Sequence, residues 1–265
     1  MIQSDLIIRD FNLIREKSPL VHNITNYVVM NNTANALLSI GASPVMAHSI
    51  DEVEEMASIA SSLVLNIGTL SKEWIKSMIL AGRTALKNGI PIILDPVGAG
   101  ATSFRTKTCF TLIEECHPTI IRGNASEIMT LAHQSNSCKG VDSIASSFQA
   151  KDAALLLAKE LNSVVVVSGE TDYITDGNKL ICIKNGSSLM SKVTGMGCTA
   201  TAITGAFAAV DEDPFQSAVS AMAVMGITGE LAAINAKGPG TMQLNFLDEL
   251  YLLSGEKIKD RLKAE

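Results

Sequence analysis

Two glycines that flank a methionine, followed directly by a cysteine, form the stretch of this sequence best suited to chemistry. Gly195 and Gly197 permit backbone angles and close approaches that a β-carbon would obstruct. The residues that follow are small and apolar and predict a buried helix that starts near Gly197. Because the first N–H groups of a helix favour an anion, the stretch predicts a cradle for a phosphoryl group in transit. A glycine turn that only leads into a buried helix would show the same spacing.

Cys198 falls in the first turn of this expected helix, beside whatever the backbone amides hold. A thiol in that position has a lowered pKa in principle, so it could be ionised or reactive. The alternative is that the cysteine acts as a small apolar residue that packs the start of the helix.

Two carboxylates and one arginine occur where strands are expected to end. Asp95 ends the apolar run Ile-Ile-Leu-Asp, and Glu127 lies four residues after Gly123. Carboxylates at neighbouring strand ends suit Mg²⁺, which keeps several waters and bridges to phosphate. Arg122 suits phosphate, because its planar guanidinium is always charged. The alternatives are that both acids cap turns or helices and that the arginine forms a surface ion pair.

The sequence lacks the motifs of several other nucleotide and metal sites. No Gly-x-x-x-x-Gly-Lys-Ser/Thr occurs, which argues against a P-loop NTPase. No Gly-x-Gly-x-x-Gly opens a first helix, and the histidines show no HxxxH or HExxH spacing. We therefore expect neither dinucleotide binding nor a zinc site.

Short apolar runs alternate with helical patterns along most of the chain, which predicts one α/β domain over residues 1–265. Such a parallel sheet is covered by helices on both faces and binds ligands beyond the carboxyl ends of its strands. The expected strands lie at 20–25, 43–48, 63–67, 91–95, 119–122 and 164–167, with a hairpin at 173–184. The expected helices lie at 4–17, 27–39, 52–61, 72–87, 103–116, 125–132, 143–161 and almost everywhere from 197 on. The polar residues at the strand ends are Asn23, Asn66, Asp95, Arg122, Asn124 and Ser168.

The expected helix at residues 27–39 has an unusual polar content. Asn26 is placed to cap it, and Asn31, Asn32 and Asn35 lie among its apolar residues. So many amides in one helix are costly unless they meet hydrogen-bonding partners, a ligand or another subunit.

Composition argues against several classes of protein. Hydrophobic residues make up 47% of the chain and charged residues 18%, which suits a large core and argues against disorder. The net charge of −6 and the lack of a Lys/Arg block argue against nucleic-acid binding. Residues 215–236 approach the composition of a membrane span, but their polar residues favour a buried helix, so we expect no membrane partner. Five scattered cysteines without a signal peptide indicate a reducing cytoplasm.

Five motifs, in order along nearly the whole chain, resemble those of the hydroxyethylthiazole kinase family, a thiamine-salvage branch of the ribokinase-like superfamily. They are His22-Asn-Ile-Thr-Asn26, Gly41-Ala-Ser-Pro-Val-Met-Ala-His48, Asp95-Pro-Val-Gly-Ala-Gly-Ala-Thr102, Arg122-Gly-Asn-Ala-Ser-Glu127 and Val193-Thr-Gly-Met-Gly-Cys-Thr199. Sugar kinases of the superfamily carry an aspartate as general base at the position of Cys198. The thiazole kinases are similar to this chain in having a cysteine there.

The resemblance implies a single-domain, ribokinase-like three-layer sandwich, with a mostly parallel central sheet, helices on both faces and no separate lid. It implies ATP-dependent phosphorylation of the primary hydroxyl of 4-methyl-5-(2-hydroxyethyl)thiazole, with Mg²⁺ as cofactor, in thiamine biosynthesis or salvage. It also implies a homotrimer whose substrate pockets lie at subunit boundaries.

Roles in handling the nucleotide carry over to four matching positions of this chain. Asp95 and Glu127 are implied to organise Mg²⁺ through water. Arg122 and Ser168 are implied to contact ATP.

Roles in handling the transferred group and the acceptor carry over to the glycine turn and to a set of nearby residues. The turn of Gly195, Gly197 and Cys198 is implied to be the anion hole, with Cys198 orienting the hydroxyl or taking its proton. The residues implied to line the thiazole pocket are Met46, the backbone of Gly195, Asn23, Asn26 and His48.

Two other functions stay open on the sequence. Another ribokinase-like activity, such as phosphorylation of a hydroxymethylpyrimidine or repair of hydrated NAD(P)H, would use the same phosphate site. A catalytically silent ATP-binding sensor would keep that site without turnover. Met46 and Cys198 favour the thiazole, and the joint presence of Asp95, Glu127 and Arg122 favours catalysis.

Overall fold

The computed structural model describes residues 4–134 and 147–265 of the chain. At its centre is an eight-stranded sheet with the strand order β2-β1-β3-β4-β5-β6-β7-β8. The strands are β1 (Leu20–Ile24), β2 (Ser43–Val45), β3 (Ser62–Asn66), β4 (Ile92–Asp95), β5 (Ile120–Asn124), β6 (Val164–Ser168), β7 (Asp172–Thr175) and β8 (Leu180–Ile183). From β2 to β6 neighbouring strands are parallel, and β7 and β8 add an antiparallel hairpin. The expected mostly parallel sheet is therefore confirmed.

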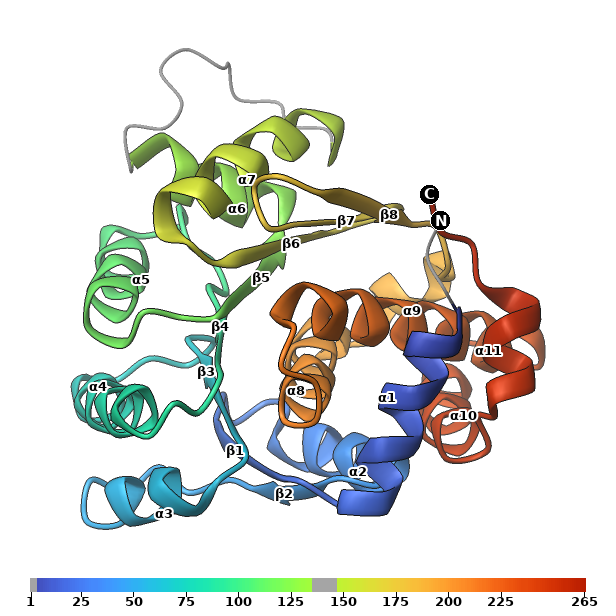
Figure 1. The fold of residues 1–265 in the computed structure, drawn as a ribbon, viewed down its shortest axis with the longest axis horizontal. Coiled ribbons are helices and arrows are strands. Elements are labelled where there is room, and N and C mark those ends of the chain that lie inside the picture. Colours follow the sequence, from blue (N-terminus) through green and yellow to red (C-terminus); the bar gives the residue numbers. More distant parts are fainter. Residues whose placement is uncertain (1–3, 135–146) are drawn as a thin grey trace.

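Helices cover both faces of this sheet, which confirms the three-layer arrangement (Figure 1). One face carries α3 (Val53–Ile59), α4 (Lys72–Lys87), α5 (Ser103–Cys116), α6 (Ala125–Gln134) and α7 (Ser147–Leu161). The other face carries α1 (Ser4–Lys17), α2 (Met30–Ile40), α8 (Met196–Ala208), α9 (Pro214–Ile234), α10 (Pro239–Tyr251) and α11 (Gly255–Arg261), with the short 3₁₀ helix η1 (Ser188–Lys192) before α8. The beginning of the helix expected at 143–161 lies outside the described residues.

The central strands of the sheet contribute side chains to the hydrophobic core on both of its faces. In β3, Leu63 and Leu65 pack with the α3–α7 layer, whereas Val64 packs with the opposite layer. Successive strand residues face opposite sides of a sheet, and here both sides are buried. This burial explains why the strands are apolar at consecutive positions instead of alternating with polar residues.

Two glycines let helix α8 pack closely, Gly195 at its N-cap against Val29 beside α2 and Gly205 within it against the sheet. The N-cap, Gly195, has a φ of 83°, and a Cβ there would lie 2.6 Å from Val29 Cγ1. The helix begins at Met196, one residue before the expected start. A Cβ on Gly205 would lie 2.8 Å from Val64 Cγ2, so this glycine lets the helix approach β3. The start of α8 consequently lies at the carboxyl ends of β3 and β4.

Helix α2 begins at Met30, three residues later than the sequence predicts. Val29 stands at its N-cap, and the described residues contain no side-chain hydrogen bond that caps it. The prediction that Asn26 caps this helix is therefore wrong. Instead, the Val29 N–H donates to the Asn26 carbonyl in a turn, which leaves the Asn26 side chain available for long-range contacts.

Helix α9 is apolar and long enough to cross a membrane by length and composition alone. However, 83% of its most apolar window is buried inside the fold. The prediction of a buried helix in this region is therefore confirmed.

Candidate active site

Asp95, the last residue of β4, is the buried acid around which the other candidates gather. Its side chain is 2% exposed, and its Oδ2 accepts hydrogen bonds from Asn66 Nδ2 at 2.7 Å and Thr201 Oγ1 at 2.8 Å. Burial raises the pKa of Asp95 to about 6, with Arg122 acting to lower it and Glu127 to raise it. Since both of these hydrogen bonds end on Oδ2, Oδ1 remains for a ligand.

Asn66 connects Asp95 to two other candidate residues. The parallel register pairs Asn66 directly with Asp95, so both side chains leave the same face of the sheet. Asn66 Oδ1 accepts a hydrogen bond of 2.9 Å from Asn26 Nδ2, and that nitrogen also donates to Cys198 Sγ at 3.3 Å. The structure thus brings Asp95, Asn26 and Cys198 together from three separate parts of the fold.

Cys198 lies in the first turn of α8, as expected, but the shift of its pKa has the opposite sign to the prediction. Burial raises the pKa of the thiol to about 11, and the charge of Asp95 raises it as well. Hydrogen bonds with Asn66 and Asn26 and the charge of Arg122 lower it by less. The prediction of a lowered thiol pKa is therefore wrong, because desolvation and the charge of Asp95 outweigh the two hydrogen bonds and the charge of Arg122. At neutral pH the thiol keeps its proton.

Arg122 places its guanidinium at the start of α8. The side chain is 9% exposed, and Nη2 donates to Ser168 Oγ, which in turn donates to the Gly123 carbonyl. A Cβ on Gly197 would lie 2.9 Å from Arg122 Nη1, so the glycine allows this close approach. Within the described part of the chain, the buried Nε has no hydrogen-bond partner. An unpartnered, buried, charged donor beside a helix N-terminus is suited to an anion.

Glu127 makes the helix-capping contacts that the sequence left open as an alternative. Its Oε2 accepts from the Asn124 N–H, and the Asn124 side chain accepts from the Glu127 N–H, which forms a capping box at the start of α6. Its Oε1 accepts from the Gly98 N–H at 2.8 Å, so it also holds the glycine-rich loop after β4. Each oxygen accepts one described hydrogen bond and keeps a lone pair for a metal or for a water bound to it. Residues 4–134 and 147–265 contain no group of three or more His, Cys, Asp or Glu side chains suited to hold a metal.

The other candidates for the thiazole pocket form two separate groups. Asn23 is fully buried in β1, where its Nδ2 donates to a carbonyl of its own strand. Its Oδ1 has no partner among the described residues. His48 follows β2; its Nδ1 lies 3.2 Å from the Met46 carbonyl, and its ring lies 4.7 Å from the ring of Trp74. None of these contacts among the described residues connects Asn23, or the pair His48 and Met46, to Cys198.

Thr201 and Trp74 belong to this region and were not predicted from the sequence. Thr201 donates to the Asp95 carboxyl, and the ring of Trp74 lies 4.8 Å from that of Tyr27, next to His48. Both missed residues lie within helices. Nothing in the local sequence separates them from ordinary core residues.

The asparagines of α2 find partners within the chain. Asn32 donates to Thr199 Oγ1 at 3.1 Å and accepts from Gln243 Nε2 at 2.9 Å. Asn35 donates to Asn31 Oδ1 at 3.1 Å. Asn32 therefore has partners within the chain for both ends of its amide, and Asn31 and Asn35 pair with each other.

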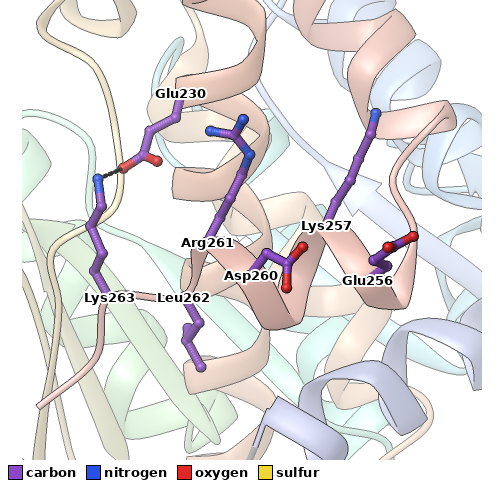
Figure 2. A pocket seen from close by; sticks show the side chains of 7 residues that line it. All are labelled: Glu230, Glu256, Lys257, Asp260, Arg261, Leu262 and Lys263. Carbon is purple, nitrogen blue, oxygen red and sulfur yellow. Dashed lines mark hydrogen bonds and ion pairs between the residues drawn. The ribbon is translucent and has the colours of Figure 1, made fainter.

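Two cavities lie away from the cluster around Asp95. One is lined by charged residues of α9 and the C-terminal segment, where Lys263 forms an ion pair of 2.8 Å with Glu230 (Figure 2). The other lies at the amino ends of β4 and β5, next to Ile92 and Thr119. Parallel sheets bind ligands at the carboxyl ends of their strands, which excludes the second cavity, and none of the described residues that line the first cavity belongs to a strand.

Comparison with known proteins relates the chain to one enzyme family. Residues 11–256 match a family model described as "Hydroxyethylthiazole kinase family". The chain is 55% identical over 258 residues to hydroxyethylthiazole kinase from Leptospira biflexa serovar Patoc, a match that covers 97% of each chain. It is similar to the structure of the hydroxyethylthiazole kinase protein from Pyrococcus horikoshii OT3, with a TM-score of 0.92, 42% identity and 98% of each chain covered.

A more distant likeness concerns the fold alone. The pyridoxal kinase from Staphylococcus aureus in complex with ADP is similar with a TM-score of 0.61 and 16% identity, over 80% of this chain and 88% of that chain. The expected ribokinase-like fold is therefore confirmed.

Proposed function

This chain belongs to the hydroxyethylthiazole kinase family, and we propose that it transfers the γ-phosphoryl group of ATP to the primary hydroxyl of 4-methyl-5-(2-hydroxyethyl)thiazole. The product serves thiamine biosynthesis. One observation carries the proposal: the buried guanidinium of Arg122, with its unpartnered Nε, lies against Gly197 at the start of α8. A guanidinium and helix amides that converge on one point neutralise the charge of a migrating phosphoryl group.

The phosphate side of the proposed site acts through position and charge. Enzymes that transfer phosphoryl groups accelerate the reaction mainly by positioning and electrostatic stabilisation. In this proposal Arg122 and Ser168 contact ATP, and their mutual hydrogen bond holds the guanidinium in place. The free amides in the turn of Gly195, Gly197 and Cys198 donate to the γ-phosphoryl oxygens and form the anion hole.

Asp95 and Glu127 fit Mg²⁺ that is held through water. Asp95 offers Oδ1, since its two described hydrogen bonds end on Oδ2, and Glu127 has both oxygens engaged by backbone N–H groups. Mg²⁺ usually keeps several waters and binds through one or two carboxylates together with phosphate. When bound, the ion neutralises charge on the phosphates, and the two carboxylates orient its waters.

Cys198 orients the acceptor hydroxyl in this proposal and does not act as a thiolate. Because burial raises the pKa of the thiol to about 11, it stays protonated at neutral pH and is not available as a base for the hydroxyl proton. Phosphoryl transfer depends mainly on positioning and electrostatic stabilisation, so orientation of the hydroxyl is the contribution that we assign to Cys198. The groups proposed to line the thiazole pocket are Met46, His48, Asn23, Asn26 and the backbone of Gly195.

We further propose that residues 1–265 act as one cytoplasmic domain and assemble as a homotrimer with pockets at subunit boundaries. Tyr27 and Val28, which follow Asn26 in the chain, are 64% and 65% exposed. Large apolar side chains exposed beside a pocket favour a second copy of the chain as their cover. Analytical ultracentrifugation measures the mass of the assembly, and a monomer at assay concentration would contradict the trimer.

A substrate panel with ATP consumption as the readout tests the proposed activity. The chain is incubated with ATP, Mg²⁺ and one acceptor at a time: the thiazole alcohol, a hydroxymethylpyrimidine or hydrated NADH. We expect turnover with the thiazole alcohol and its loss in Arg122→Ala. Turnover with another acceptor alone would assign the rival activity, and ATP binding without any turnover would indicate a sensor.

A further inference from the structure

Asn66 lies between the two sides of the proposed site and contacts both. It is 1% exposed at the end of β3, and its Nδ2 donates to Asp95 Oδ2 at 2.7 Å on the phosphate side. On the acceptor side its Oδ1 accepts from Asn26 Nδ2 at 2.9 Å, and that nitrogen donates to Cys198 Sγ at 3.3 Å. One buried amide therefore joins the acid to the neighbourhood of the thiol.

The backbone fixes the orientation of this amide. The Gly68 N–H donates to Asn66 Oδ1 at 2.9 Å, and a backbone N–H can only donate. Oδ1 must therefore face Gly68, which turns Nδ2 toward Asp95. A flipped amide would set Nδ2 against the Gly68 N–H, donor against donor, and Oδ1 against Asp95 Oδ2, acceptor against acceptor. Both contacts would be buried and unsatisfied.

Asn26 is confined by the same residues. A Cβ on Gly68 would lie 2.6 Å from Asn26 Nδ2, so the glycine leaves the space that the amide occupies. The two protons of Asn26 Nδ2 match its two contacts, with Asn66 Oδ1 and Cys198 Sγ. Buried polar networks whose groups are satisfied are rigid, so a displacement at Asn66 reaches Cys198 through Asn26 as well as through the hydrogen bond of Asn66 with the thiol.

We propose that Asn66 is a positioning residue that couples the phosphate side of the site to the acceptor side. The inference rests on the proposed function, because it assigns Asp95 to the phosphate side and Cys198 to the acceptor side. Asn66 holds Oδ2 of Asp95 so that Oδ1 stays free for the metal and phosphate. It holds Asn26 so that the thiol stays aimed at the acceptor hydroxyl. A displacement of about 1 Å between reacting partners costs roughly 100-fold in rate.

Two substitutions at Asn66 separate its contact with Asp95 from its contacts with Asn26 and Gly68. Asn66→Ala removes all three, whereas Asn66→Asp keeps an acceptor for Gly68 and Asn26 but sets a second carboxylate against Asp95. We expect Asn66→Ala to lower kcat roughly 100-fold and to change the KM for ATP by less than about threefold. Asn26→Ala should lower kcat little further in the Asn66→Ala background. Asn26→Ala should keep its full effect in the Asn66→Asp background, because residue 66 still carries an acceptor oxygen for Asn26 there.

Asn185→Ala is the matched control for the loss of a buried amide. Asn185 is 5% exposed and donates to Glu230 and the Arg261 carbonyl, two residues that line the charged cavity of Figure 2 and not the candidate site. The effect of Asn26→Ala should be the same in this background as in the wild type. An equal effect in the Asn66→Ala background would overturn the proposal, as would an Asn66 variant that raises the KM for ATP at unchanged kcat. If Asn66→Ala does not fold, Asn66→Asp is measured instead. A lowered kcat supports the proposal, and a raised KM for ATP at unchanged kcat overturns it.

The rate at which iodoacetamide alkylates Cys198 measures the coupling independently of catalysis. Asn26→Ala and Asn66→Ala should each change the alkylation rate, measured by peptide mass spectrometry, in the same direction. The double variant should change it no further than Asn66→Ala does, and Asn185→Ala should leave it unchanged. Independent effects of the two substitutions would refute the coupling. The expected pattern in a chain that phosphorylates no alcohol would refute the proposed function and retain the coupling.

Discussion

Replacing Asp95 with asparagine should stabilise the fold at neutral and alkaline pH while it removes activity. Burial raises the pKa of Asp95 from 3.8 to about 6. Since one pKa unit corresponds to about 1.4 kcal/mol, ionising this acid costs the folded state about 3 kcal/mol. The amide of Asp95→Asn has nearly the same shape, and its carbonyl oxygen can keep the hydrogen bonds from Asn66 and Thr201.

The dependence on pH follows from the direction of this shift. Because the pKa is higher in the folded state, the folded protein holds the proton of Asp95 more tightly than the unfolded chain does. The free energy of unfolding of the wild type therefore falls as the pH rises from 3.8 to about 6. Below that range both states carry the proton, so wild type and variant differ little. Above it, Asp95→Asn should be more stable by about 3 kcal/mol.

Urea unfolding at a fixed protomer concentration, without nucleotide or Mg²⁺, measures this difference. The gap in free energy of unfolding between Asp95→Asn and the wild type should widen from about pH 4 to about pH 8. Asp176→Asn is the control: burial raises the pKa of Asp176, but the N–H groups of Lys179 and Asn178 lower it more, so the net shift is downward. That substitution should not stabilise the protein. An Asp95→Asn variant no more stable than the wild type at about pH 8 would refute the reasoning.

Three further substitutions test other parts of the site. Gly197→Ala puts a Cβ 2.9 Å from Arg122 Nη1, so we expect the KM for ATP to rise about tenfold; an unchanged KM would contradict the close contact. Glu127→Gln should raise the Mg²⁺ concentration for half-maximal activity several-fold, and identical metal titrations would argue against the metal site. Cys198→Ala should lower kcat about tenfold without altering the pH profile between about pH 6 and 9, since the thiol titrates at about 11. A kcat equal to that of the wild type would remove the thiol from the chemistry.

Local sequence patterns were sufficient for most of the fold. Helices α4 and α5 begin and end where the sequence predicts. Their first residues follow Ser71 and Thr102, whose side chains accept hydrogen bonds from backbone N–H groups of the first turn. Such capping signals lie within a few residues of each helix end, so a reading of the sequence finds them. The consecutive apolar residues of the strands likewise predict a sheet that is buried on both faces.

The candidate site could be predicted only in part. Asp95, Arg122 and Ser168 were placed at one edge of the sheet, because parallel strands end at the same edge. The start of α8 was predicted to within one residue from its glycines, since the backbone freedom of glycine is a local property. The local pattern assigned Asn26 to a helix cap, and only the family resemblance assigned it to the site. The same asparagine side chain can cap a helix or contact a distant residue, and the local sequence does not show which of the two it does.

The contacts that give the site its chemistry arise from the packing of the layers. Asn26 lies 40 residues from Asn66 and 172 residues from Cys198 along the chain, so no local pattern relates the three side chains. The position of Cys198 at a helix start, which the sequence predicts, favours a lowered thiol pKa. The raised pKa comes first from desolvation, which the sequence does not show. Desolvation prevails here because atoms from distant elements surround the thiol and exclude water from it.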